Sequence, residues 1–151
     1  MSVTIREGDP RTPAVRALLN ASHALMQALF PPEDNFYLEI DALCVPSITF
    51  LVAEVDGAVC GCGAIARKDG YAEIKSMYVD EAARGKGVAA ALLDALETRA
   101  RGDGIGVLRL ETGNLLHSAL RLYERHGFVR IGPFGDYPDS PSSLFYEKRL
   151  V

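Results

Sequence analysis

The sequence has no tryptophan, only three histidines and three cysteines, and no long apolar run. No apolar segment approaches the roughly 18 residues that cross a bilayer, so we expect no membrane-spanning helix and no membrane partner. The first residues include Arg6, Glu7 and Asp9 and lack the basic-then-apolar order of a signal peptide. These absences predict a cytoplasmic protein.

The scarcity of cysteine and histidine also limits the metal and disulfide chemistry. Cys44, Cys60 and Cys62 form no even set, and one Cys-x-Cys without a companion pair is a poor zinc signature. No group of histidine, aspartate and glutamate shows ligand spacing. We therefore expect buried free thiols on a strand and no metal cofactor.

The composition is that of one globular domain over residues 1–151, with 48% hydrophobic and 24% charged residues. The net charge of −4 is unevenly distributed: residues 1–60 carry three arginines and eight acids, whereas residues 84–130 carry eight bases and five acids. A basic half suits a phosphorylated cofactor, and an acidic half suits a cationic substrate. No basic run has interleaved aromatics, so we expect no nucleic-acid partner.

The most informative stretch is residues 71–101, which predicts a strand, a glycine-rich turn and a helix. The strand, Tyr71 to Val79, is rich in β-branched and aromatic residues. The turn that follows reads Arg84-Gly85-Lys86-Gly87-Val88-Ala89, and the helix carries leucines on one face. Unpaired N–H groups at a helix start, beside two basic residues, predict a phosphate or pyrophosphate site.

Three nucleotide-binding motifs resemble this arrangement. A Walker-type loop fails because Val88 stands where a hydroxyl should hold magnesium. A dinucleotide fingerprint is formally present in Gly85, Gly87 and Ala90, but its strand should be a buried parallel one, and Glu73 and Lys75 argue against this. The third motif, Arg/Gln-x-x-Gly-x-Gly/Ala, is matched by Arg84, Gly87 and Ala89.

Hydrophobic periodicity and turn residues predict the remaining elements. Asp56-Gly57 indicates a hairpin, and Gly61 and Gly63 indicate a bulge or a close backbone approach in its second strand. Three antiparallel strands therefore precede the glycine turn. We expect helices at 13–30 and 118–126, a loop with a short helix at 33–47, and strands at 3–5, 49–55, 58–67, 71–79, 107–111, 128–131 and 144–149.

Two spaced motifs, Arg84-x-x-Gly87-x-Ala89 and Ala119-Leu120-Arg121-Leu122-Tyr123-x-x-x-Gly127-Phe128, together resemble the GCN5-related N-acetyltransferases (GNAT). The resemblance covers nearly the whole chain and is closest to small single-domain bacterial members. It implies an α/β (α+β) fold with a mixed, mostly antiparallel central sheet that is splayed at the acetyl-CoA site, and helices on both faces.

The resemblance implies acetyl-CoA as co-substrate, with its pyrophosphate on the main-chain N–H groups of residues 84–89 and its pantetheine beside Met77 and Val79. Many relatives carry an asparagine seven residues before the tyrosine, where this chain has Leu116, so Asn114 or His117 is expected to take its place. The expected cofactor-binding residues are Met77, Tyr78, Val79, Arg84, Gly85, Lys86, Gly87, Val88, Ala89, Asn114 and His117.

The resemblance also implies direct attack of a primary amine in a ternary complex. Tyr123 is the expected acid for the departing thiolate, and Glu73 is the leading candidate for the base. Each has a plainer alternative: Tyr123 packs between helix and sheet, and Glu73 is a surface carboxylate paired with Lys75 or Arg109. Glu111 and His117 are further candidates for the base. The main-chain N–H of Val79 is the expected oxyanion donor.

The acceptor side is expected to use the aromatic residues Phe30, Tyr37 and Tyr137, with Glu33 and Asp34 nearby. This combination predicts a small amine or an amino-acid derivative as acceptor. Alternatives are a protein or peptide acceptor, a non-catalytic acyl-CoA sensor and a nicotinamide oxidoreductase. The sequence leaves a homodimer open.

Overall fold

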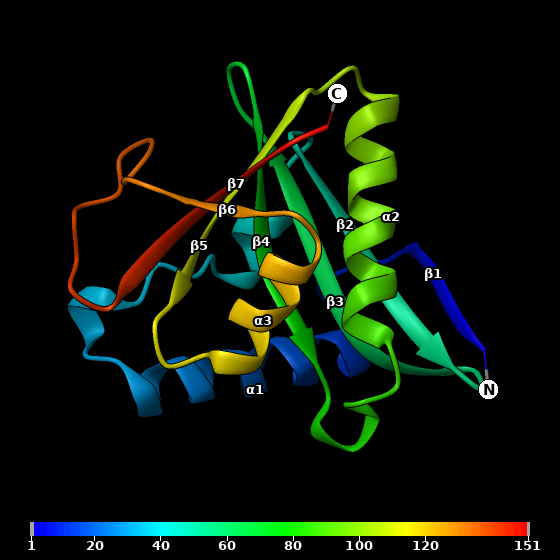
Figure 1. The fold of residues 1–151 in the computed structure, drawn as a ribbon. Helices are drawn as coiled ribbons and strands as arrows, with labels where there is room; N and C mark the ends of the chain where they lie inside the picture. Colours follow the sequence, from blue (N-terminus) through cyan, green and yellow to red (C-terminus); the bar gives the residue numbers. More distant parts are fainter. Residues whose placement is uncertain (1, 151) are drawn as a thin grey trace.

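The computed structural model describes residues 2–150 and contains one mixed seven-stranded sheet (Figure 1). The strand order is β1-β2-β3-β4-β5-β7-β6, and the β4–β5 pair is parallel while the other pairs are antiparallel. This is the predicted mixed, mostly antiparallel sheet. The strands are β1 (Val3–Glu7), β2 (Ile48–Val55), β3 (Ala58–Arg67), β4 (Ala72–Val79), β5 (Val107–Gly113), β6 (Val129–Ile131) and β7 (Ser143–Arg149).

Helices cover both faces of the sheet, as expected. Helix α1 (Pro13–Leu29) packs on one face, through a core that includes Leu19, Phe50 and Ala64. Helices α2 (Val88–Gly102) and α3 (His117–Arg125) contribute to a larger core on the other face. Short 3-10 turns complete the chain: η1 (Pro32–Asp34), η2 (Ile40–Cys44) and η3 (Glu81–Ala83). No helix among residues 2–150 has the length and apolarity needed to span a membrane.

The β3–β4 pair contains the irregularity that the glycines predicted, but the extra residue lies on β4. The register slips between Cys62 and Ala64, where Gly63 faces both Ser76 and Met77. Ser76 adopts a left-handed backbone with φ of 57°, which only glycine adopts without cost. A Cβ atom on Gly63 would collide with the Met77 sulfur, so the expected close approach is confirmed.

Cys60 and Cys62 are the expected buried thiols on β3. Cys44 is only partly buried and lies in η2, within the loop and short helix expected at 33–47.

The central strands β4 and β5 separate along their length. They pair only at Ala72 with Leu108 and at Glu73 with Arg109. Beyond Glu73 the two strands part, and in Figure 1 the gap widens toward the lower end of β4, with α3 in front of it. The expected splay of the sheet is therefore present.

Candidate active site

The glycine turn leads from the end of β4 into α2. Gly85 and Gly87 have positive φ values of 77° and 80°, as the motif predicted, and Gly87 is the N-cap of α2 without a side-chain cap. Val88 is buried in the core, so only its main chain faces the turn, and Ala89 follows in the first helical turn. The first N–H groups of α2 therefore remain without a side-chain partner from the cap.

Arg84 and Lys86 differ in how they are held. The Arg84 Nε donates a hydrogen bond to the Val79 carbonyl at 3.1 Å, and its guanidinium lies 5.5 Å from the Tyr78 ring centroid. Lys86 is exposed and forms no ion pair with another residue between 2 and 150. The flexible lysine and the folded-back arginine together place two positive charges at the start of α2.

The end of β4 presents main-chain groups to the gap. The Asp80 N–H donates to the Cys60 carbonyl of β3 at 2.8 Å. Successive N–H groups of a strand point to opposite edges of that strand. Since Asp80 and Tyr78 face β3, the N–H groups of Val79 and Met77 point toward β5. There β5 has already diverged, so these donors are available to an added extended chain.

Tyr123 lies on α3 at the gap and is buried with Phe128 and Tyr146 around it. Burial raises the pKa of its phenol, and the nearby Glu111 carboxylate raises it further. The phenol therefore stays protonated at physiological pH, which is the form that a proton donor requires. Its oxygen forms no hydrogen bond to another described residue, unlike that of Tyr137.

The two substitutes for the missing asparagine are placed differently. Asn114 is bound to the last loop, since its N–H donates to Ser142 and its side-chain amide to the Pro141 carbonyl. His117 is exposed in the first turn of α3, directly after the N-cap Leu116. Of these two residues, His117 has the side chain that is accessible to a ligand at the start of α3.

Glu73 is buried on β4, not at the surface, with 5% of its area exposed. The Tyr137 hydroxyl donates to its carboxylate, and the Lys75 Nζ lies 3.5 Å from the same Oε2 atom. Arg109, the other suggested partner, pairs with Glu147 instead. Burial, and then the Glu73 carboxylate, raise the pKa of Tyr137, which keeps this donor protonated.

A cavity of about 420 Å³ opens over Glu73 on the α1 face of the sheet. Residues far apart in sequence form it: the loop after η1, the β3–β4 turn, β4 itself and the loop before β7. Two of the three aromatic residues predicted for the acceptor, Tyr37 and Tyr137, line it. The full lining is Phe36, Tyr37, Leu38, Ala66, Lys68, Tyr71, Glu73, Lys75, Gly135, Asp136, Tyr137 and Pro138.

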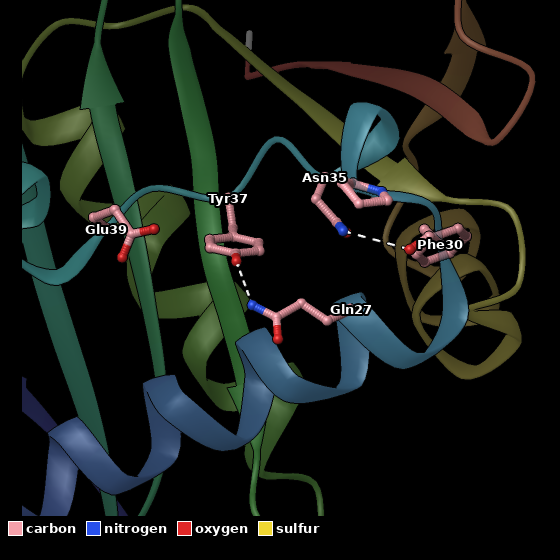
Figure 2. Close-up of a pocket in the computed structure, with 6 residues that line it drawn as sticks. Gln27, Phe30, Asn35, Tyr37 and Glu39 are labelled. Carbon is pink, nitrogen blue, oxygen red and sulfur yellow. Dashed lines mark hydrogen bonds between the residues drawn. The ribbon is translucent and has the colours of Figure 1, made fainter.

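The third predicted aromatic, Phe30, lies in a neighbouring cavity of about 330 Å³ between α1 and the following loop (Figure 2). Tyr37 borders both cavities, and its hydroxyl accepts a hydrogen bond from the Gln27 side chain at 2.8 Å. The ring also stacks on His23 with centroids 4.0 Å apart. Tyr37 is therefore a fixed wall between the two cavities.

Asp34 joins the two loops that enclose the Glu73 cavity, and it does not line the cavity as a free carboxylate. Its two carboxylate oxygens accept hydrogen bonds from the hydroxyls of Ser140 and Ser142. Glu33 is exposed and also lies outside the lining. The sequence placed these two acids near the acceptor, and neither of them lines the Glu73 cavity.

We expect Asp34→Ala to raise the acceptor KM about tenfold with a smaller change in kcat, because two charge-assisted hydrogen bonds that close the loops are lost. Steady-state kinetics with the acceptor varied would measure this, and Glu33→Ala on the same turn is the matched control. A higher KM for acetyl-CoA with an unchanged acceptor KM would contradict the role given to Asp34.

A family model and several relatives match this chain over most of its length. The model of the acetyltransferase (GNAT) family matches residues 14–128. An IAA acetyltransferase of Azospirillum brasilense is 42% identical over 151 residues, which is 99% of both chains. The chain belongs to the GNAT acetyltransferase family. A solved acyl-CoA N-acyltransferase from Klebsiella pneumoniae is 34% identical, with a TM-score of 0.84 over 99% of this chain and 98% of that one.

Membership of the GNAT family confirms the predicted resemblance, the fold and the acetyltransferase class. A more distant GNAT structure, yncA of Salmonella typhimurium, is 22% identical with a TM-score of 0.74 over 99% of this chain and 94% of that one, and it holds acetyl-CoA. No group of three or more histidine, cysteine, aspartate or glutamate residues within 2–150 is arranged to hold a metal ion.

Sequence reasoning named neither Lys75 nor Tyr71 as part of an acceptor site. Lys75 could have been found, because it follows Glu73 by two residues and alternate residues of a strand share a face. Tyr71 carries the same signal, because it precedes Glu73 by two residues on the strand predicted from Tyr71 to Val79. The structure places it in the cavity together with residues of the loop at 135–138.

Proposed function

We propose that this protein transfers the acetyl group of acetyl-CoA to the primary amine of a small acceptor bound in the Glu73 cavity. The observation that carries the proposal is the splay of β4 from β5. The cofactor turn follows the end of β4, the buried Glu73 lies near its start, and α3, which carries Tyr123, lies in front of the gap (Figure 1). An acceptor and a cofactor can therefore approach from opposite ends of one strand.

The fit to acetyl-CoA rests on main-chain donors. The N–H groups of Met77 and Val79 face the open gap, and the glycine turn with Arg84 and Lys86 provides N–H groups and positive charge for a pyrophosphate. His117, at the start of α3, is the proposed side-chain contact in place of the missing asparagine, while Asn114 holds the loop. Acetyl-CoA supplies an activated thioester when bound.

The chemistry needs one base, one acid and one oxyanion donor. Glu73 lies six residues before Val79 on β4, roughly 20 Å along the strand, so it takes the proton from the ammonium of the acceptor through bound water. The neutral amine nitrogen can then form a bond to the acetyl carbonyl carbon. The Val79 N–H stabilises the negative charge that develops on the carbonyl oxygen. Tyr123 gives its proton to the sulfur as the carbon–sulfur bond breaks, and the second proton of the nitrogen returns to the Tyr123 oxygen. Glu73 then releases its proton to solvent, so the products are free CoA and the N-acetylated amine.

A small acceptor is favoured over a protein tail because two loops border the cavity and are joined to each other. Phe36 packs edge-on against Tyr137 at 5.5 Å, and Asp34 joins the loops that carry these residues. A peptide acceptor would need an extended groove in place of this enclosure.

The test is release of CoA thiol from acetyl-CoA with a panel of small amines, with the N-acetylated product identified by mass spectrometry. Turnover on free amines, and little on a lysine-containing peptide, supports the proposal. Tight CoA binding without turnover on any amine would assign the protein to the non-catalytic class, and turnover on the peptide alone would assign it a protein substrate.

For the cofactor turn, we expect the double variant Arg84→Glu/Lys86→Glu to weaken CoA binding at least about tenfold, because two cations near the phosphates become anions. Isothermal calorimetry measures the affinity. Arg11→Glu/Arg16→Glu changes the net charge equally on exposed residues of the opposite end of the chain and is the control. Equal affinities in both double variants would contradict the proposed pyrophosphate site.

A further inference from the structure

We propose that the acceptor is an α-amino acid with an apolar side chain, and that Lys75 binds its carboxylate. This inference rests on the proposed function for the fate of the amine. It differs from the cationic acceptor that the charge distribution predicted, because the charges of the cavity itself are not those of residues 1–60.

The Lys75 ammonium lies at the floor of the cavity beside the proposed base. Its Nζ donates to the Tyr137 hydroxyl at 2.8 Å and to the Phe36 carbonyl at 3.1 Å, and it lies 3.5 Å from the Glu73 carboxylate. Only 11% of the Lys75 side chain is exposed, so the charge is poorly screened by solvent. A purely cationic acceptor would have to place its ammonium next to this fixed cation.

The remaining charges of the cavity are balanced. The lining contains two acids, Glu73 and Asp136, and two bases, Lys68 and Lys75, and none of the acids of residues 1–60. A balanced pair of charges on one strand face complements a molecule whose ammonium and carboxylate are attached to one carbon. With the ammonium at Glu73, the carboxylate replaces Glu73 as the third partner of the Lys75 Nζ.

The walls of the cavity suit an apolar side chain. Phe36, Tyr37, Tyr71 and Tyr137 supply ring surface, and Leu38 and Pro138 add aliphatic surface. Tyr37 and Tyr137 are held by hydrogen bonds of their own, so the walls are formed before a ligand binds. A volume of about 420 Å³ fits a single amino acid.

The test compares L-leucine, L-methionine and L-phenylalanine with the amide of each, which keeps the amine and the side chain but lacks the carboxylate. We expect the wild-type protein to favour each acid over its amide at least about tenfold in kcat/KM. Lys75→Met should lower kcat/KM for the acids at least about tenfold, mainly through KM, and change the amides much less. Arg16→Met removes an exposed cation outside the cavity lining, so it is the control and should leave the preference for the acids intact.

Three results would overturn the inference: a preference for the amides, an equal loss on acids and amides in Lys75→Met, or an equal loss of the preference in Arg16→Met. Calorimetric titration of L-phenylalanine into the CoA-bound protein separates binding from chemistry. If no acceptor is acetylated but L-phenylalanine binds and Lys75→Met abolishes that binding, the proposed function fails and the inference stands. If amines without a carboxylate are acetylated and the amino acids neither react nor bind, the proposed function stands and the inference fails.

Discussion

Glu73→Gln is expected to lower kcat/KM for the acceptor by about 10²-fold or more near neutral pH, the scale of a lost general base. The amide can no longer take a proton from the ammonium of the acceptor. It is nearly isosteric, and its oxygen can still accept the hydrogen bond from Tyr137 that the carboxylate accepts in the structure. The cavity should therefore persist, and CoA affinity should stay close to that of the wild type. Steady-state kinetics and calorimetry measure these two quantities.

The pH profile separates catalysis by Glu73 from a structural role. At alkaline pH a larger share of the amine is already neutral in solution, so the deficit of Glu73→Gln should shrink as the pH rises. A deficit that is constant with pH would show that Glu73 only positions Tyr137 and Lys75.

Glu111→Gln provides the matched comparison, because Glu111 is a half-buried carboxylate on β5, which borders the gap. Burial raises its pKa, against the opposing effects of the Ser143 hydroxyl and of Lys75. The Ser143 hydroxyl donates to its carboxylate at 2.8 Å. Recovery at alkaline pH in Glu111→Gln, and not in Glu73→Gln, would transfer the role of base to Glu111.

The parts of the fold that local sequence determines were predicted with small errors at their ends. Pro31 and Pro32 predicted the end of α1, which stops at Leu29 because Phe30 already leaves the helical backbone. The positive φ values of Gly85 and Gly87 followed from the motif. The bulge at Ser76 was assigned to the wrong strand, since the glycines lie on β3 and the residue that bulges is an ordinary serine on β4.

The candidate site was only partly predictable, because its contacts join segments that are distant in sequence. Glu73 and Tyr137 are 64 residues apart, and Asp34 and Ser142 are 108 residues apart. No local pattern specifies which loop covers β4. The sequence therefore predicted which aromatic residues belong to the acceptor site, but not how they lie relative to one another. It also placed Asp34 near the acceptor, but nothing local in the sequence indicates that its carboxylate binds Ser140 and Ser142.

Tyr123→Phe is the last large effect that we expect, a fall of about 10²-fold in kcat with nearly unchanged CoA affinity. The substitution removes one oxygen and keeps the ring that packs near Phe128 and Tyr146, so the free energy of unfolding should change little. Because burial raises the pKa of Tyr123, its deprotonation should not limit the wild-type rate at any pH up to about 10.

Single-turnover kinetics would isolate the chemical step, and Tyr146→Phe, which removes a hydroxyl bound to Glu124 instead, is the control. An unchanged single-turnover rate in Tyr123→Phe would reduce Tyr123 to a packing residue, and the departing thiolate would then take its proton from water.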